Sequence, residues 1–219
     1  MNWLLTTVIS SISAFVATNL DDILVLMLFF RQVDDQFRRR HIVTGQYLGF
    51  LVIILASLPG FFGGRLLPQP WIGLLGMVPI AIGLYQLCRP DHEEKKTQII
   101  SVTEQTQALS PKLSLSSLLG AKTYGVAAVT FANGGDNIGI YVPLFASNNL
   151  ASLGIILALF FIMVGVWCYI ALRLAQFPGI AHFLVRYGDA LIPFVFIGLG
   201  IFILLENDSF SLVGLRSPF

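Results

Sequence analysis

Two short polar clusters interrupt otherwise apolar segments of the sequence, and their residue types could do chemistry. The first spans residues 19–22, Asn-Leu-Asp-Asp, and the second spans residues 133–137, Asn-Gly-Gly-Asp-Asn. Both contain Asn-x-x-Asp, and the second copy follows the first by 114 positions. Ionisable groups are unfavourable inside a membrane, so their presence there indicates function. The repetition predicts one site built from two related halves.

The oxygen-bearing side chains of the clusters suit a divalent cation. Asn at position i and Asp at i+3 share one face of a continuous helix, so each cluster would present both groups together. Carboxylate and amide oxygens are ligands that hard divalent cations prefer. Two carboxylates in an empty site repel each other, so one would hold a proton and release it when metal binds. The four predicted metal ligands are Asn19, Asp22, Asn133 and Asp136.

The other polar residues of the clusters are secondary candidates. An offset of 115 between the halves would pair Asp21 with Asp136 instead, and would add Asn137 to the metal ligands. On a regular helix Asp21 faces about 100° away from Asp22. It would therefore contact the ion from unwound backbone or carry a separate proton. Two neighbouring hydroxyl residues are candidates for lining the ion path: Thr18 and Thr130.

Both clusters lie in apolar segments that are too long for one straight membrane span. The first segment covers residues 3–30 and the second covers residues 115–146. A helix as long as the first would measure about 42 Å, whereas the hydrocarbon core of a bilayer is about 30 Å thick. Gly134 and Gly135 directly precede Asp136, and glycine weakens a helix. Tilt, protrusion or a break near the cluster would absorb the excess length. A break of helices 1 and 4 at the clusters would let irregular backbone line a cavity, and close helix packing is the alternative role of the glycines.

The composition indicates an all-α integral membrane protein. Of the 219 residues, 56% are hydrophobic and 11% are charged, whereas a soluble domain carries about 25% charged residues. The long apolar blocks differ from the short alternating strands of a β-barrel. The two cysteines, Cys88 and Cys168, form no C-x-x-C motif, so no zinc or disulfide framework is predicted. Six transmembrane helices are expected, at about Trp3–Phe30, Ile42–Phe62, Trp71–Leu87, Leu115–Ala146, Leu150–Leu174 and Ala190–Leu205.

The loop charges predict the orientation of these helices. Loops one, three and five contain eleven of the thirteen Lys and Arg residues, and the opposite side has Arg65 and Arg216 only. Basic loops remain in the cytoplasm. The sequence therefore predicts a multi-pass protein of the plasma membrane with both termini outside.

A polar segment divides the chain into two similar units. Residues 89–113 are expected to form a cytoplasmic linker, between a three-helix repeat at residues 1–88 and another at residues 114–219. Because three is an odd number, the second unit would cross the membrane with the opposite orientation. Such a pair of units is an inverted-topology repeat, which places a transport site near the membrane midplane.

The clusters and their flanking residues resemble those of the cadmium resistance transporter (CadD-type) family of the lysine-exporter superfamily. The likeness rests on Ala-Thr-Asn-Leu-Asp-Asp at residues 17–22 and Phe-Ala-Asn-Gly-Gly-Asp-Asn at residues 131–137. It extends over nearly the whole chain and implies export of cadmium or another divalent metal. Related cation transporters of the superfamily have an acidic residue where this chain has Asn19 and Asn133. This difference lowers the charge of the ligand set, and oxygen ligands suit manganese, magnesium or calcium at least as well as cadmium.

These observations favour a secondary transporter over an enzyme. The absence of a Walker motif argues against direct ATP drive, so proton antiport with alternating access is predicted. No cofactor is expected beyond the divalent metal ion as substrate; the partners are protons and the lipid bilayer, and no nucleic acid. Export of a small organic cation or amino acid is the alternative. An intramembrane aspartyl protease and a membrane scaffold without transport are more remote alternatives.

Overall fold

The computed structural model describes residues 2–88, 120–207 and 209, and of residues 2, 121, 136 and 178–190 it describes the backbone only. The predicted linker at residues 89–113 therefore lies outside the described residues. Within the described residues all regular structure is helical, without a strand, as predicted. The helices are α1 (Asn2–Asn19), α2 (Asp22–Arg31), α3 (Arg39–Leu66), α4 (Gln69–Leu74), α5 (Met77–Cys88), α8 (Ala121–Asn133), α9 (Gly135–Ala146), α10 (Leu150–Leu174) and α11 (Pro178–Glu206).

The long apolar segments are broken at both polar clusters. Helix α1 ends at Asn19 and α2 begins at Asp22, and the two axes differ in direction by 57°. The side chain of Asp21 accepts a hydrogen bond from the backbone N–H of Asp22 at the start of α2. Helices α8 and α9 are separated by Gly134 alone. Each cluster thus contributes the end of one half-helix and the start of the next.

Three or four of the described helical segments are long and apolar enough to cross a membrane. Three qualify by length and composition alone: Arg39–Leu66, Gln69–Cys88 and Leu150–Leu174. The bent pair of α1 and α2 is a fourth if it counts as one span. Two further apolar segments are shorter, namely Asn137–Ala146 and Leu191–Glu206. Helix α11 also begins at Pro178 rather than near Ala190, because proline suits the first turn of a helix and the helix continues beyond the apolar residues.

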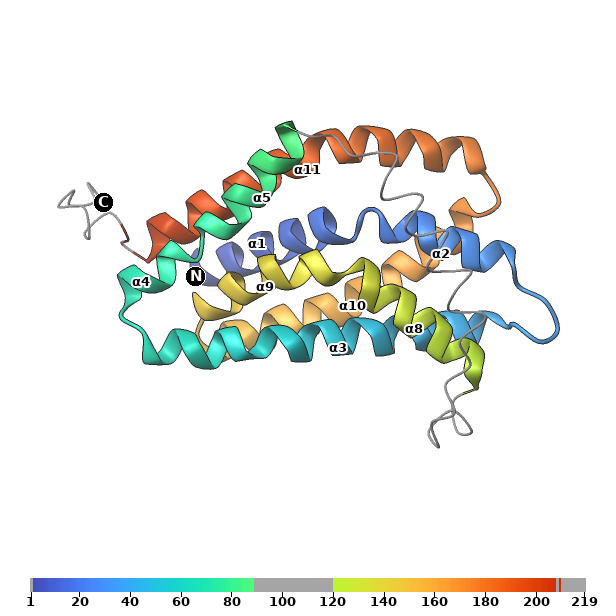
Figure 1. Ribbon diagram of the computed structural model, residues 1–219, viewed down its shortest axis with the longest axis horizontal. Coiled ribbons are helices and arrows are strands. Elements are labelled where there is room, and N and C mark those ends of the chain that lie inside the picture. Colours follow the sequence, from blue (N-terminus) through green and yellow to red (C-terminus); the bar gives the residue numbers. More distant parts are fainter. Residues whose placement is uncertain (1, 89–119, 208, 210–219) are drawn as a thin grey trace.

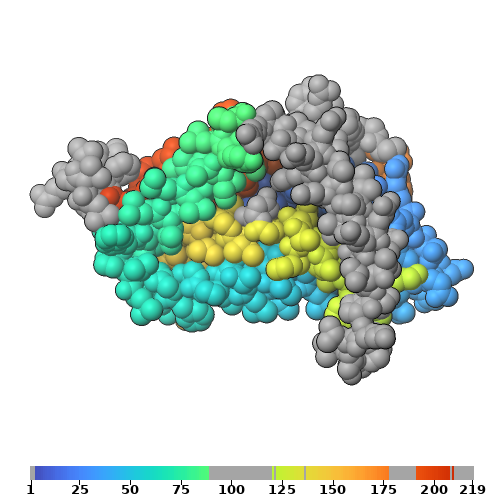
Figure 2. All heavy atoms as spheres, in the orientation of Figure 1, coloured from blue at the N-terminus to red at the C-terminus, as the bar shows by residue number. Residues whose placement is uncertain are grey.

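The helices form one elongated bundle in which the two parts of the chain alternate (Figure 1). Helices α1 and α2 run in one direction along the long axis, and α8 and α9 run in the other. Helix α3 packs along α8 and α9, and α10 packs along α1 and α2. Helix α5 pairs with α11. In the space-filling view α9 reaches the surface between α5 and α3 (Figure 2).

Glycines allow α3 to approach α8 and α9 closely. A Cβ atom on Gly49 would lie 2.6 Å from the backbone oxygen of Ala127 and 2.6 Å from Cβ of Thr130. A Cβ atom on Gly64 would lie 2.5 Å from the backbone oxygen of Ala146. Real Cβ atoms do not come this close, so only glycine fits. Small residues at such contacts bring membrane helices within backbone distance of each other.

The turn between α2 and α3 is organised by Asp34. Its Oδ1 accepts hydrogen bonds from the backbone N–H groups of Phe37 (2.5 Å) and Gln36 (2.7 Å). These bonds, the one from Phe37 first, hold the pKa of Asp34 below its usual value. The Phe37 ring stacks on His41, and Lys122 Nζ lies 5.8 Å from the centre of the Phe37 ring. The turn is therefore connected to both α3 and α8.

Candidate functional site

Asp22, the first residue of α2, lies at the centre of a buried polar network. The residue is 3% exposed, and its two carboxylate oxygens accept hydrogen bonds from two different helices. Gln46 Nε2 of α3 donates to Oδ2 (3.1 Å), and Asn133 Nδ2 of α8 donates to Oδ1 (2.5 Å). Thr130 Oγ1 of α8 donates to Gln46 Oε1 (2.6 Å). The network thus joins the first cluster to the end of α8, where the second cluster begins.

The groups around Asp22 are of the kind that stabilise an anion. A buried charge is unfavourable unless it receives hydrogen bonds, and here two amide groups donate to it. The start of a helix carries a partial positive charge that also stabilises an anion. Gln46 and Asn133 are neutral, so they stabilise this negative charge without neutralising it. These two donors therefore add no positive charge that would repel a cation.

Asn19 belongs to a second buried network, next to the first. Its Nδ2 lies 2.8 Å from each of three acceptors: the backbone oxygen of Phe15, Thr18 Oγ1 and Tyr141 OH. A hydrogen bond of 2.7 Å also joins Thr18 Oγ1 and Tyr141 OH. Trp167 Nε1 donates to the backbone oxygen of Asn19 (2.7 Å). Within the described structure, Oδ1 of Asn19 is buried without a hydrogen-bond partner.

The expected shared face of Asn19 and Asp22 is wrong, because the two residues do not lie on a continuous helix. The helix ends at Asn19 and restarts at Asp22 after a bend of 57°. As a result, the carboxamide of Asn19 faces Thr18 and Tyr141. The carboxylate of Asp22 contacts Gln46 and Asn133 instead.

The second cluster surrounds the junction of α8 and α9. Asn133 ends α8 and contacts Asp22, whereas Asp136 is the second residue of α9 and is described by its backbone only. Asn137 is 1% exposed, and its backbone N–H donates to the oxygen of Gly134 (3.2 Å). Of the predicted ligands, the structure therefore places Asp22 and Asn133 in direct contact. Among the described residues no group of three or more His, Cys, Asp and Glu side chains could hold a metal ion.

Two polar residues complete the networks without belonging to either cluster. Gln46 lies in the second apolar segment, where a polar side chain could have been recognised from the sequence as a candidate site residue. Tyr141 follows Asn137 by one helical turn on α9, but its ring type is common in apolar helices and gives no such signal. Its ring is fully buried, and only its hydroxyl oxygen contacts polar atoms of α1.

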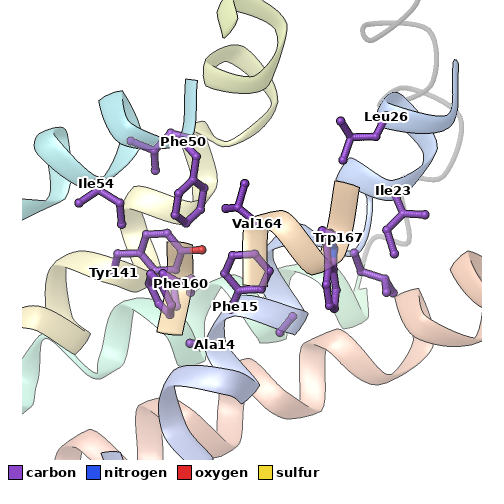
Figure 3. Close-up of a cluster of buried hydrophobic side chains, with 14 of the residues drawn as sticks. Ala14, Phe15, Ile23, Leu26, Phe50, Ile54, Tyr141, Phe160, Val164 and Trp167 are labelled. Atoms are coloured by element: carbon purple, nitrogen blue, oxygen red, sulfur yellow. The ribbon is translucent and has the colours of Figure 1, made fainter. Parts of the chain in front are cut away.

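A cluster of aromatic side chains packs directly beside the polar networks (Figure 3). The rings of Tyr141 and Phe160 are 4.8 Å apart, and Phe15 lies 5.6 Å from both Phe50 and Phe160. Trp167 packs edge-on against Phe15 at 5.3 Å. On α1, Phe15 precedes Asn19 by one turn, so the rings lie on the side of the networks where α1 begins. Packed rings exclude water from this side of the site.

The comparisons with known proteins agree with the apolar helices. No curated protein and no solved structure matches the chain significantly. The family model described as "Cadmium resistance transporter" matches residues 15–215, which include both clusters and all the residues of the two networks. This is a family of transporters. The chain belongs to the cadmium resistance transporter family.

Proposed function

We propose that the protein exports divalent metal cations by proton antiport, with Asp22 as the central ligand. The observation that carries the proposal is the buried Asp22 carboxylate, held by neutral amides from α3 and α8. A metal ion entering this site would replace the hydrogen bonds from these two amides, which carry no charge. Cadmium, manganese, magnesium and calcium are the candidate cargoes, since each accepts oxygen ligands.

The helix arrangement supports the proposal of two inverted repeats with three spans each. Helix α3 of the first repeat packs on α8 and α9 of the second, and α10 of the second packs on α1 and α2 of the first. Helices α5 and α11, the last of each repeat, pack on each other. The broken helices run in opposite directions (Figure 1). Such reciprocal packing is expected when a pseudo-twofold axis lies in the membrane plane.

In this arrangement the second carboxylate of the site would be that of Asp136. Its position at the start of α9 corresponds to the position of Asp22 at the start of α2. Asn19, Asn133 and Asn137 would complete the ligand set, with Thr18 and Thr130 beside the ion path. Asp21 would contact the ion through unwound backbone or carry a separate proton. Two carboxylates match the charge of a divalent cation. Without metal, a proton on one of them would relieve their repulsion, which couples metal binding to proton release.

The charges at the ends of the bundle support a cytoplasmic location for one end. The start of α3, the end of α2 and the start of α8 lie together at one end (Figure 1). Loop and end residues there include Arg31, Arg38, Arg39, Arg40 and Lys122. The opposite end, where α3 ends, has Arg65. The basic end would face the cytoplasm of a plasma-membrane protein, and the aromatic cluster would then close the outer side of the site.

Metal flux into proteoliposomes tests the proposal. Wild-type protein should transport at least one of Cd²⁺, Mn²⁺, Mg²⁺ and Ca²⁺, and an imposed pH gradient should change the rate. Asp22→Asn and Asp136→Asn should each abolish flux, because each removes one of the two charges that attract the cation. The matched control is Asp35→Asn, which removes a carboxylate from the exposed turn and should leave flux unchanged.

Normal metal flux in both Asp22→Asn and Asp136→Asn would contradict the shared site. Flux that ignores the pH gradient would remove antiport and leave metal transport intact. Wild-type protein that moves an organic cation such as lysine, and none of the four metals, would favour the amino-acid exporter instead.

A further inference from the structure

The carboxamide of Gln46 lies between a hydrogen-bond acceptor, Asp22, and a hydrogen-bond donor, Thr130. Its Nε2 donates to Asp22 Oδ2, and its Oε1 accepts from Thr130 Oγ1. All three residues are buried, with exposures of 4% for Gln46, 3% for Asp22 and 2% for Thr130. At this burial each polar atom needs a partner in every state of the protein. The state with metal bound must therefore provide new partners for the same atoms.

A metal ion at Asp22 is incompatible with the observed orientation of Gln46. One N–H group of Nε2 points its hydrogen at Asp22 Oδ2, where the cation would bind. Rotating the carboxamide by about 180° about its last torsion exchanges Oε1 and Nε2, and this torsion has a broad, roughly two-fold profile. Oε1 would then face the cation and Nε2 would face Thr130.

Thr130 can accept this exchange because a hydroxyl group both donates and accepts hydrogen bonds. In the structure Oγ1 donates to Gln46 Oε1. With metal, Oγ1 would accept from Gln46 Nε2 and turn its own proton to the carbonyl one turn earlier on α8, a common bond for threonine in helices. Every polar atom of the three residues then keeps a partner in both states.

We propose that Gln46 is a reversible metal ligand, whose carboxamide caps Asp22 in the empty site and turns its oxygen onto the bound cation. The inference rests on the proposed metal transport and adds a ligand from α3 that neither cluster contains. Because the ligand is neutral, it adds coordination without adding charge. A neutral ligand favours release of the cargo, which an exporter requires as much as binding.

Three substitutions at Gln46 test the proposal through the half-saturation concentration and the maximal rate of Cd²⁺ and Mn²⁺ flux in proteoliposomes. Gln46→Leu keeps the volume but removes both polar atoms, and should raise the half-saturation concentration roughly 10- to 100-fold. Gln46→Met repeats the test with an unbranched chain, in case the leucine variant folds poorly. Gln46→Glu adds a charged ligand and should lower the half-saturation concentration about tenfold while slowing the maximal rate.

Thr130 gives a second, independent test. Thr130→Val removes the hydroxyl group with little change in shape, and should raise the half-saturation concentration, because Nε2 of the turned carboxamide loses its acceptor. Thr130→Ser keeps the hydroxyl group and should restore wild-type values. The matched control is Ser57→Ala on α3, since Ser57 is fully buried but bonds only the backbone oxygen of Ile53 on its own helix.

The results separate a ligand from a merely structural residue. If Gln46 only packs against its neighbours, Gln46→Glu and Gln46→Leu should both raise the half-saturation concentration. This outcome would overturn the proposal. Wild-type half-saturation values in Gln46→Leu or Gln46→Met would also overturn it. In either case, flux in wild-type protein and its loss in Asp22→Asn would leave the proposed function standing. Absence of metal flux in wild-type protein would overturn both.

Discussion

At the scale of single residues, the two polar networks differ in what they hold. The Asp22 network surrounds a carboxylate with amide groups, which a cation can displace. The Asn19 network contains a hydroxyl pair and a carboxamide, and it joins the end of α1 to the middle of α9 through Tyr141. The first is therefore suited to ion binding. In the second, Tyr141 is suited to holding the bend between α1 and α2, while Oδ1 of Asn19 has no hydrogen-bond partner within the described structure.

Tyr141→Phe tests the structural part of this division. The change removes the hydroxyl group and keeps the ring, whose contacts with Phe160 and Phe145 remain. Asn19 Nδ2 retains two acceptors for its two hydrogens, so the loss should be modest, about 1 kcal/mol of unfolding free energy. Thermal unfolding in detergent should show a lowered midpoint.

Tyr169→Phe is the matched control for this prediction. Tyr169 is exposed, and its hydroxyl accepts a hydrogen bond from Arg173 Nε at the surface. Its removal should leave the midpoint unchanged. Equal midpoints for the two variants would contradict a structural role of the Tyr141 hydroxyl group.

The residues of the site could in part be predicted from the sequence, but the groups that each side chain contacts could not. Asp22 and Asn133 were predictable because polar groups in apolar segments are rare and need a reason. The separation of Asn19 from Asp22 was not, because it depends on how the chain turns at Leu20 and Asp21. Gln46 contacts Asp22 only because α3 packs against α8, a contact that local sequence does not specify.

At the scale of elements, α3 is the helix that completes the site. Gly45 and Gly49 precede and follow Gln46, and both lie against α8. A Cβ atom on Gly45 would lie 2.6 Å from Val126 Cβ and 2.7 Å from the backbone oxygen of Thr123. The glycines therefore set the distance at which Gln46 reaches both Thr130 and Asp22.

Gly49→Ala should separate α3 from α8. The added methyl group would overlap a backbone oxygen, which cannot move aside as a flexible side chain can. Overpacking of this kind costs about 1–3 kcal/mol of unfolding free energy, and the shift should also weaken the contact between Gln46 and Thr130. A lowered unfolding midpoint together with reduced metal flux is expected.

Gly63→Ala on the same helix is the control for this effect. A Cβ atom there meets no atom within 4 Å, and alanine favours the helix by up to about 1 kcal/mol. Its midpoint should therefore be unchanged or raised. If Gly49→Ala behaves like Gly63→Ala, then close packing of α3 on α8 does not position the site.

The breaks between the half-helices were the most predictable feature of the elements. The first apolar segment exceeds the thickness of a bilayer, and Gly134 and Gly135 weaken the other long segment. The structure has a break at each cluster. The early start of α11 at Pro178 was not predictable from hydropathy, because polar residues continue a helix beyond its apolar part.

At the scale of the whole molecule, the alternation of the two chain halves is what brings the clusters together. Neither half could form the Asp22 network alone, because Asp22 and Gln46 come from the first half and Thr130 and Asn133 from the second. The ends of the bundle differ in charge, because one has Arg38, Arg39 and Arg40 where the other has Arg65. One end should face the cytoplasm, and the other should face outside.

Thiol labelling tests this orientation with the cysteines that the chain provides. Cys88 is exposed at the end of α5, directly before the linker, and Cys168 is buried. In intact cells a membrane-impermeant maleimide should not label Cys88, and labelling should appear after permeabilisation. Leu66→Cys in a Cys88→Ala background should react in intact cells, since Leu66 is 86% exposed where α3 ends.

Asp35→Cys in the same background supplies the matched position at the basic end, in the turn between α2 and α3. Its labelling should resemble that of Cys88 and differ from that of Leu66→Cys. The reason is that α3 is one span, so the turns at its two ends lie on opposite sides of the membrane. Labelling of both introduced cysteines in intact cells would show that α3 does not cross the membrane. The reverse pattern would place the basic end outside, and the aromatic cluster beside Asp22 would then close the cytoplasmic side of the site.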